Sequence, residues 1–291
     1  MAWAQIAPPP GWTDDPTAAL TALIAAQEWP PWILAEMSDR LVHAPGAAGS
    51  GGNTLVNAAA AAGHGELVRN ALDSNWPEPA RSDHELMLWA ADYGAYEVVL
   101  NRLAPETTRP MLEIARGWLA GDPAVELRRR LGGGEAAEER RTVPIGDGYA
   151  HVGCLRVTAA DGRWAEVMTG HLAIVTYIEE ALGIGPSLDE LLARSLSIGD
   201  PDDLNWWGPL HAVKGRADVP ATLRWAVGVL ESPDPGARDF ASVVVHLLSL
   251  EEQPAPERET VLPVLRRRLA AEREPQIRLS LLAALDSYEV S

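Results

Sequence analysis

Apolar residues recur at the spacing of an α-helix along most of this chain of 291 residues. The pattern predicts helices over residues 17–29, 32–41, 109–119, 124–131, 171–182 and 188–196, and over two stretches that end at Leu250 and Tyr288. Proline, glycine and aspartate separate these segments, as helix starts and stops require; Asp122-Pro123, Pro235 and Pro275 are such starts. Ser187 and Glu190 form a capping-box pattern before the helix at 188–196. We therefore expect a mainly α protein.

One short stretch departs from the helical pattern and predicts a β-hairpin. Residues 154–158 and 163–168 flank Asp161 and Gly162, and an Asp-Gly pair favours a tight turn with positive φ. A charge run precedes this hairpin at residues 135–141, and we expect it to be a solvated linker or helix end. The prediction is one small β-hairpin insert in a helical chain.

Two stretches near the N-terminus can be laid over each other, residues 53–72 and residues 84–103, with an offset of roughly thirty residues. Each carries a pair of alanines, which lets helices approach closely, and then a glycine that ends the first helix. The aligned residues are Ala59 with Ala90, Ala60 with Ala91 and Gly63 with Gly94. A unit of this size cannot bury its apolar face alone, so we expect it to stack on its neighbour.

These two copies resemble the ankyrin repeat. The resemblance rests on Ala-Ala-x-x-Gly-His-x-Glu-Leu-Val over residues 59–68 and on the matching residues 90–99. The usual Thr-Pro-Leu-His opening is reduced to Thr-Leu-Val-Asn in the first copy. A generic pair of helical hairpins is the alternative.

The C-terminal third resembles HEAT repeats, from about residue 190 to residue 291. Pro235 and Arg238 recur as Pro275 and Arg278, at an offset of about forty residues. Together the two resemblances imply an α-solenoid of stacked helical hairpins, similar in order to helical-repeat proteins of actinobacteria. We divide the chain into ankyrin-like repeats at 1–141, an insert of hairpin plus helix at 142–186, and HEAT-like repeats at 187–291. Whether one continuous solenoid results stays open.

The formal net charge of −17 limits the classes of partner. An acidic protein repels phosphate backbones, so we expect no nucleic-acid binding. A protein or peptide partner remains, and the charge favours a cationic one. The single cysteine fits a reducing compartment, and Lys214, the sole lysine, fits a GC-rich bacterial genome. With no signal peptide and no apolar run of about eighteen residues, we expect a cytoplasmic protein without a membrane span. The oligomeric state is not decided.

Two groups of aromatic and charged residues are candidate binding surfaces. Tryptophans beside carboxylates can hold a cation or an arginine-rich segment. The first group is Asp202, Asp203, Trp206 and Trp207, and the second is His84, Trp89, Tyr93 and Tyr96. The alternative is that these aromatic side chains pack between helices.

Catalytic and metal-binding patterns are sparse. Asp147, His151, Cys154 and His171 flank the hairpin, but zinc normally needs a second close-spaced ligand pair, so we expect no metal. No glycine-rich nucleotide motif occurs, and we expect no cofactor. The expected function is a non-catalytic binding or scaffold module. The alternative is an enzyme on a helical-repeat scaffold, with its site at His151, Cys154 and His171.

A further alternative comes from a resemblance to alkylpurine DNA glycosylases, which are built on HEAT-like helices. The residue types it needs are present at Trp206, Trp207, Asp202, Asp203, Arg216 and Arg224. The acidic charge argues against this reading, because a DNA-binding groove must be basic.

Overall fold

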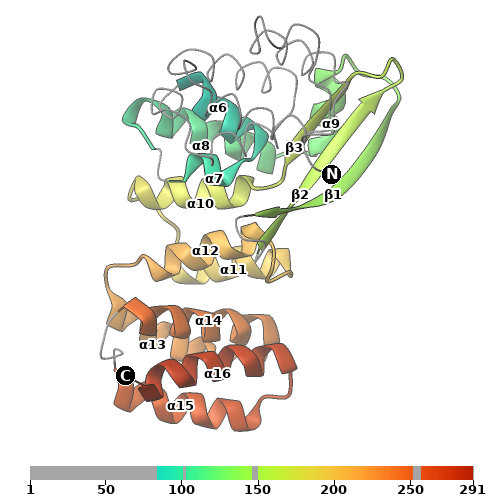
Figure 1. Ribbon diagram of the computed structural model, residues 1–291. Coiled ribbons are helices and arrows are strands. Elements are labelled where there is room, and N and C mark those ends of the chain that lie inside the picture. Colours follow the sequence, from blue (N-terminus) through green and yellow to red (C-terminus); the bar gives the residue numbers. More distant parts are fainter. Residues whose placement is uncertain (1–83, 101–102, 146–149, 252–256, 291) are drawn as a thin grey trace, which may run out of the picture. The chain divides into compact units, whose positions relative to one another are not determined.

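The computed structural model describes residues 84–290 apart from 101–102, 146–149 and 252–256. The first ankyrin-like copy at 53–72, the helices expected at 17–29 and 32–41, and Asp147 lie outside the described residues. Within the described residues there are eleven helices and one three-stranded sheet (Figure 1). The prediction of a mainly α protein is confirmed.

The chain forms two compact units. Unit 1 comprises the residues up to Val143 together with Val152–Val175, and unit 2 comprises Pro144–His151 and Thr176–Ser291. The described helices of unit 1 are α6 (His84–Tyr93), α7 (Tyr96–Val99), α8 (Pro105–Leu119), α9 (Pro123–Arg130) and the first residues of α10 (His171–Ala181).

The second ankyrin-like copy forms two helices around a glycine, as its sequence predicts. Gly94 separates α6 from α7 and has a φ of +81°, a left-handed conformation that glycine adopts at least cost. A Cβ atom on Gly94 would lie 2.2 Å from the carbonyl oxygen of Met168. The glycine is therefore required both by the turn and by the close approach of the chain to Met168.

The sheet of unit 1 has the strand order β1 (Ala136–Ile145), β2 (Ala150–Ala159) and β3 (Trp164–Met168). Strands β2 and β3 form the expected hairpin, with Cys154 opposite Met168 and Arg156 opposite Glu166. Gly162 in its turn has a φ of +85°, as the Asp-Gly pair predicts.

The linker expected at 135–141 was wrong, because most of it belongs to strand β1. Residues 137–140 are exposed on both faces of the strand, so no alternation of apolar and polar residues marks them. Pairing with β2 places this charged segment in a sheet. The insert therefore contains three strands in place of one hairpin.

Helices α8 and α9 cover one face of the sheet. Trp118, Leu127 and Leu131 pack there against Leu155, Val157 and Val167 of strands β2 and β3. Helix α9 begins as its sequence predicts, with Pro123 in the first turn and the Asp122 carboxylate accepting the Ala124 amide at 2.8 Å.

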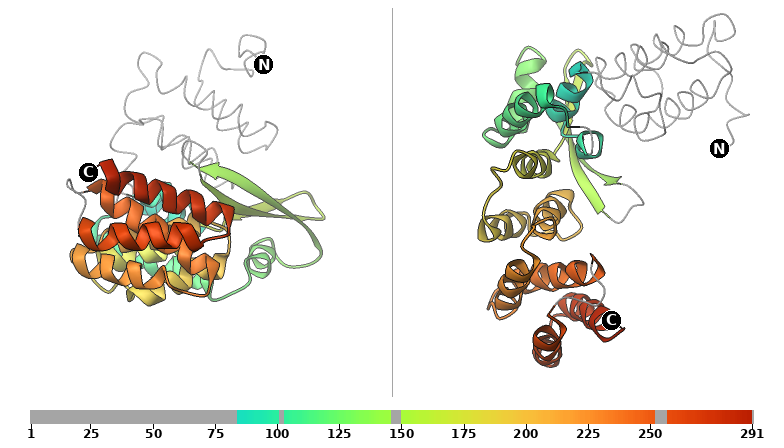
Figure 2. Two further views of the ribbon diagram at one scale, coloured as in Figure 1. Left: turned by 90° about the horizontal axis from the view of Figure 1, so that it is seen from below. Right: turned by 90° about the vertical axis from the view of Figure 1, so that its left-hand side faces the viewer.

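Unit 2 is built from six further helices: α11 (Leu188–Ile198), α12 (Leu204–Lys214), α13 (Val219–Val229), α14 (Pro235–Glu251), α15 (Arg258–Ala271) and α16 (Pro275–Val290). Helices consecutive in the chain pack as α11 with α12, α13 with α14 and α15 with α16. Helix α14 also packs on α12 and α16, and Figure 2 shows α14 beside α16. Their shared core includes Trp206, Phe240, Val244, Leu265 and Leu281.

Local signals of the sequence set the helix boundaries in unit 2. Ser187 and Glu190 form the expected capping box, in which the serine hydroxyl accepts the Glu190 amide and the glutamate accepts the Ser187 amide. Pro235 and Pro275 begin α14 and α16, as predicted.

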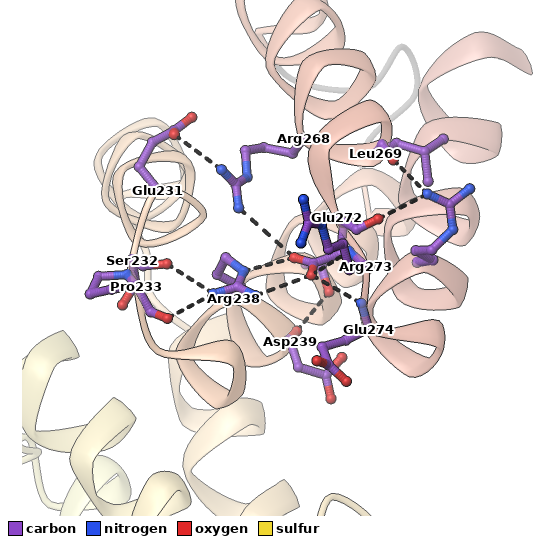
Figure 3. Close-up of polar contacts among 12 residues, drawn as sticks. Glu231, Ser232, Pro233, Arg238, Asp239, Arg268, Leu269, Glu272, Arg273 and Glu274 are labelled. Atoms are coloured by element: carbon purple, nitrogen blue, oxygen red, sulfur yellow. Dashed lines mark hydrogen bonds and ion pairs between the residues drawn. The ribbon is translucent and has the colours of Figure 1, made fainter.

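An arginine after each of these prolines binds the end of the preceding helix (Figure 3). The Arg238 guanidinium donates to the Ser232 and Pro233 carbonyls and, at 2.7 and 3.1 Å, to both carboxylate oxygens of Glu272. Arg278 donates to the Glu272 and Leu269 carbonyls at 3.1 and 2.8 Å. These bonds satisfy carbonyl groups that a helix end or the following turn leaves without partners.

Candidate binding pocket

A pocket of about 440 Å³ opens in unit 1 between helices α8 and α9. We call it the α8–α9 pocket. Its lining residues are Asp92 of α6, Glu113, Ile114, Gly117 and Trp118 of α8, Gly121 and Asp122 of the turn, and Val125, Glu126 and Arg130 of α9. Among the described residues, four carboxylates and one guanidinium therefore line a space that also has an apolar side.

Trp118 forms a fixed wall of the pocket because three groups hold its ring. The indole N–H donates to the Asp92 carboxylate at 2.9 Å. One ring contact is with His171, stacked at a centroid distance of 5.3 Å, and the Arg130 guanidinium lies 4.8 Å from the ring centroid. Trp118 as a whole is only 8% exposed, so these contacts hold its side chain in place beside a ligand.

Arg130 forms ion pairs with two carboxylates of the lining, Asp92 and Glu126. It donates to both Asp92 oxygens, at 2.5 and 2.7 Å, and to Glu126 at 2.9 Å. Hydrogen bonds from Arg129 and Arg130 lower the pKa of Glu126 to about 2, so this carboxylate stays ionised at neutral pH. Glu113 has no such guanidinium partner among the described residues and adds a further carboxylate to the lining.

The floor of the pocket is open because two of its residues are glycines. A Cβ atom on Gly117 or on Gly121 would meet no heavy atom within 4 Å. Apolar side chains line this opening as well, since Ile114 is half-buried and Val125 is 58% exposed. Large exposed apolar groups next to carboxylates suit a ligand that is cationic and partly apolar.

A second polar cluster, centred on Glu166, lies buried in unit 1. The Tyr93 hydroxyl donates to Glu166 at 2.6 Å, and Arg156 and Arg141 donate to the same carboxylate at 2.7 and 3.2 Å. Burial is the main cause of the raised pKa of Tyr93. Because every polar group of this cluster has a partner, it binds α6 to the sheet and offers no reactive group to a substrate.

The first group of expected binding residues divides between core and surface. Trp206 is 3% exposed and packs edge-on against Phe240, while Trp207 is half-buried. Asp203 caps helix α12 by accepting the Asn205 amide at 2.7 Å. Of the four residues, Asp202 alone has an exposed side chain.

The second group also contributes largely to the interior. Tyr93 and Tyr96 are buried, and Trp89 stacks on Tyr93 at a centroid distance of 5.0 Å. His84 begins α6 and is exposed. None of these four residues lines the α8–α9 pocket.

The three residues of the enzyme alternative have separate surroundings. His151 contacts the Asp200 carboxylate at 3.1 Å. Cys154 is buried, and burial, with the nearby Glu166 charge, raises the pKa of its thiol to about 11. His171 is 4% exposed beneath Trp118, and burial lowers its pKa to about 4. The thiol is therefore protonated at neutral pH and a poor nucleophile.

The arginines of the glycosylase alternative are engaged within unit 2. Arg216 donates to Glu180 at 2.7 Å and to the Pro186 carbonyl, and Arg224 donates to Glu257 at 3.3 Å. In the part of the chain that the structure describes, no three His, Cys, Asp or Glu side chains are grouped to hold a metal ion. Among the same residues, no helix has the length and apolar character of a membrane span.

Comparison of the chain with protein-family models, with curated proteins and with solved structures finds no match. The sequence analysis missed the α8–α9 pocket because its lining comes from three helices, whose contacts depend on the tertiary fold. The available signal was local: Gly117 and Gly121, on either side of Trp118, are four residues apart, about one helical turn, and neither has a side chain to fill the space.

Proposed function

We propose that this protein is a non-catalytic binding module whose α8–α9 pocket takes a cationic side chain of a peptide or protein partner. The observation that carries the proposal is the lining of the pocket, where the described residues supply four carboxylates, Asp92, Glu113, Asp122 and Glu126, and one guanidinium, Arg130; Arg129 bonds Glu126 from outside the lining. Carboxylates in a concave site attract ammonium and guanidinium groups more strongly than the same groups on a flat surface. Exposed Val125 and half-buried Ile114 add an apolar surface next to the charge.

A peptide partner fits this site better than a nucleic acid or a substrate. The net charge of −17 repels phosphate, which disfavours the glycosylase alternative. The enzyme alternative lacks support because Cys154 and His171 are buried in states that suit neither nucleophile nor base at neutral pH. The pocket instead supplies fixed charges and a rigid aromatic wall, which are features of recognition.

The helical architecture fits a binding module, and we propose that it is a solenoid. In α13–α14 and α15–α16, an arginine binds the carbonyl six residues before it, Ser232 for Arg238 and Glu272 for Arg278. The two sets of residues are offset by forty positions, the spacing of the HEAT-like pattern. Glu272 also binds Arg238 of the preceding hairpin, which supports a repeated stacking contact. On this proposal, α6 and α7 belong to the ankyrin-like part.

The test is a calorimetric titration with two synthetic peptides of equal length, one alternating arginine with leucine and the other with glutamate in place of arginine. We expect the basic peptide to bind and the acidic peptide to give no heat. Glu113→Arg reverses a charge of the lining, and Gly117→Arg fills the floor. Each variant is expected to weaken binding at least about tenfold, which corresponds to about 1.4 kcal/mol.

The matched control is Asp286→Arg, which makes the same change in net charge at an exposed residue of helix α16. It is expected to bind the basic peptide as the wild type does. An equal loss in Asp286→Arg and Glu113→Arg would assign the binding to net charge alone and would refute the pocket. Absence of binding by the wild type would refute the proposed function.

A further inference from the structure

Strand β1 lies at the edge of the sheet in unit 1, and no described strand pairs with its other side. The strand order is β1-β2-β3, so within the described residues β1 pairs with β2 only (Figure 1). Residues 137–140 and Thr142 are exposed, and the Arg140 side chain is 66% exposed. Such an edge presents backbone N–H and C=O groups to which another strand can bind.

The charges along β1 change from acidic to basic, so a second copy that runs antiparallel presents the opposite charges. Residues 138–141 read Glu-Glu-Arg-Arg, with a local net charge of zero in a chain of net charge −17. A strand whose charges all have one sign repels a second copy of itself. Here antiparallel pairing of two copies brings the acidic half of each strand to the basic half of the other.

The geometry of antiparallel strands narrows the possible registers. Directly opposite residues point to the same face of a sheet, and so do residues two apart in one strand. Glu138 and Arg140 therefore share a face. A two-fold axis at Glu139 places Glu138 of each copy opposite Arg140 of the other. The two Glu139 side chains then meet on the other face, where each Arg141 guanidinium, diagonal to them, already donates to Glu166 of its own chain.

We propose that β1 is a self-association surface, and that its occupant is β1 of a second copy of this chain in antiparallel pairing. The Glu138 carboxylate already contacts Arg128 of its own helix α9 and lies 3.8 Å from Arg140. A second Arg140 would complete a network of alternating charge across the axis. The α8–α9 pocket includes no residue of β1, so this proposal is independent of the proposed function.

The test uses sedimentation velocity over a wide range of protein concentration. The wild type is expected to change from monomer to dimer as concentration rises. Arg140→Glu sets like charges opposite each other at both Glu138–Arg140 positions, and Glu138→Arg does the same with the opposite sign. Each variant alone is expected to associate at least about tenfold more weakly than the wild type.

Mixing the two variants tests whether the order of charges causes the weaker association of each variant alone. In the mixed pair, both positions again hold one glutamate and one arginine, so the dimer is expected to return. Arg140→Gln, which removes attraction without adding repulsion, is expected to weaken the dimer less than Arg140→Glu. Circular dichroism checks that each variant is folded.

Three results would overturn the proposal. A wild type that stays monomeric at every concentration removes the interaction. Variants that associate as strongly as the wild type move it to another surface. A mixture of two folded variants that stays monomeric shows that the proposed pairing of Glu138 with Arg140 is wrong.

Discussion

Trp118 illustrates how a residue can serve both the core and a binding surface. Its helical spacing predicts a packed side chain, and Trp118 does belong to the core cluster that contains Leu155 and Val157. Trp118 nevertheless also lines the α8–α9 pocket, where its N–H donates at 2.9 Å to Asp92, a residue 26 positions away in the sequence. The sequence predicts the burial of Trp118. The meeting with Asp92 and Arg130 depends on the tertiary fold.

Gly94 gives the first prediction at this scale. Gly94→Ala places a non-glycine residue at a φ of +81° and a Cβ atom 2.2 Å from the Met168 carbonyl oxygen. Left-handed backbone and overpacking together are expected to lower the free energy of unfolding by about 2–5 kcal/mol. Urea unfolding followed by circular dichroism measures it.

Gly117→Ala is the matched control, because the same change meets open space in the last turn of helix α8. It is expected to raise the free energy of unfolding by about 0.5–1 kcal/mol through better helix propensity. Equal effects at the two glycines would contradict the close approach of Gly94 to Met168.

At the scale of elements, the sequence was most informative where a boundary depends on neighbouring residues. The Asp122-Pro123 start of α9, the Ser187 capping box and the Pro235 and Pro275 starts were predicted because caps act within one turn. Strand β1 was missed because its residues 137–140 carry no apolar face. Its conformation is set by pairing with β2, which no window of local sequence contains.

The capping box of α11 gives a prediction for an element. Ser187→Ala removes the hydroxyl that accepts the Glu190 amide, and it leaves an amide at the helix start without a partner. We expect a loss of about 1 kcal/mol in the free energy of unfolding. Ser187→Asp, which keeps an acceptor at the cap, is expected to lose much less, as measured by urea unfolding of both variants. Equal losses would show that the serine hydroxyl does not cap α11.

At the scale of the whole molecule, protonation of a buried histidine and of surface carboxylates changes the stability of the fold in opposite directions. The protein has a net charge of −17, and acidification reduces the mutual repulsion of its carboxylates. Burial instead lowers the pKa of His171, so the folded state resists its protonation. The net pH dependence of stability is the difference between these effects, and a single substitution can isolate one part of it.

The last prediction isolates His171. Its ring stacks on Trp118, and one ring nitrogen lies 3.2 Å from the Asp92 carbonyl oxygen. The charges of Asp92 and Arg130 also act on this ring. Its pKa falls from an ordinary 6.5 to about 4 in the folded state. Between these values the unfolded chain binds more protons than the folded one, so this histidine lowers stability as the pH falls below about 6.5. From about pH 7 to about pH 5.5, its share of the loss is roughly 1 kcal/mol.

His171→Gln keeps a hydrogen-bonding side chain but does not titrate. We expect its free energy of unfolding to fall less than that of the wild type over the same pH interval, by that roughly 1 kcal/mol. Comparing slopes with pH separates this effect from the constant cost of altering the stack on Trp118. His84→Gln, at an exposed residue of α6, is the control and should keep the wild-type slope. If His171→Gln keeps that slope as well, the histidine is not held neutral in the folded protein, and the account of its burial beneath the pocket wall fails.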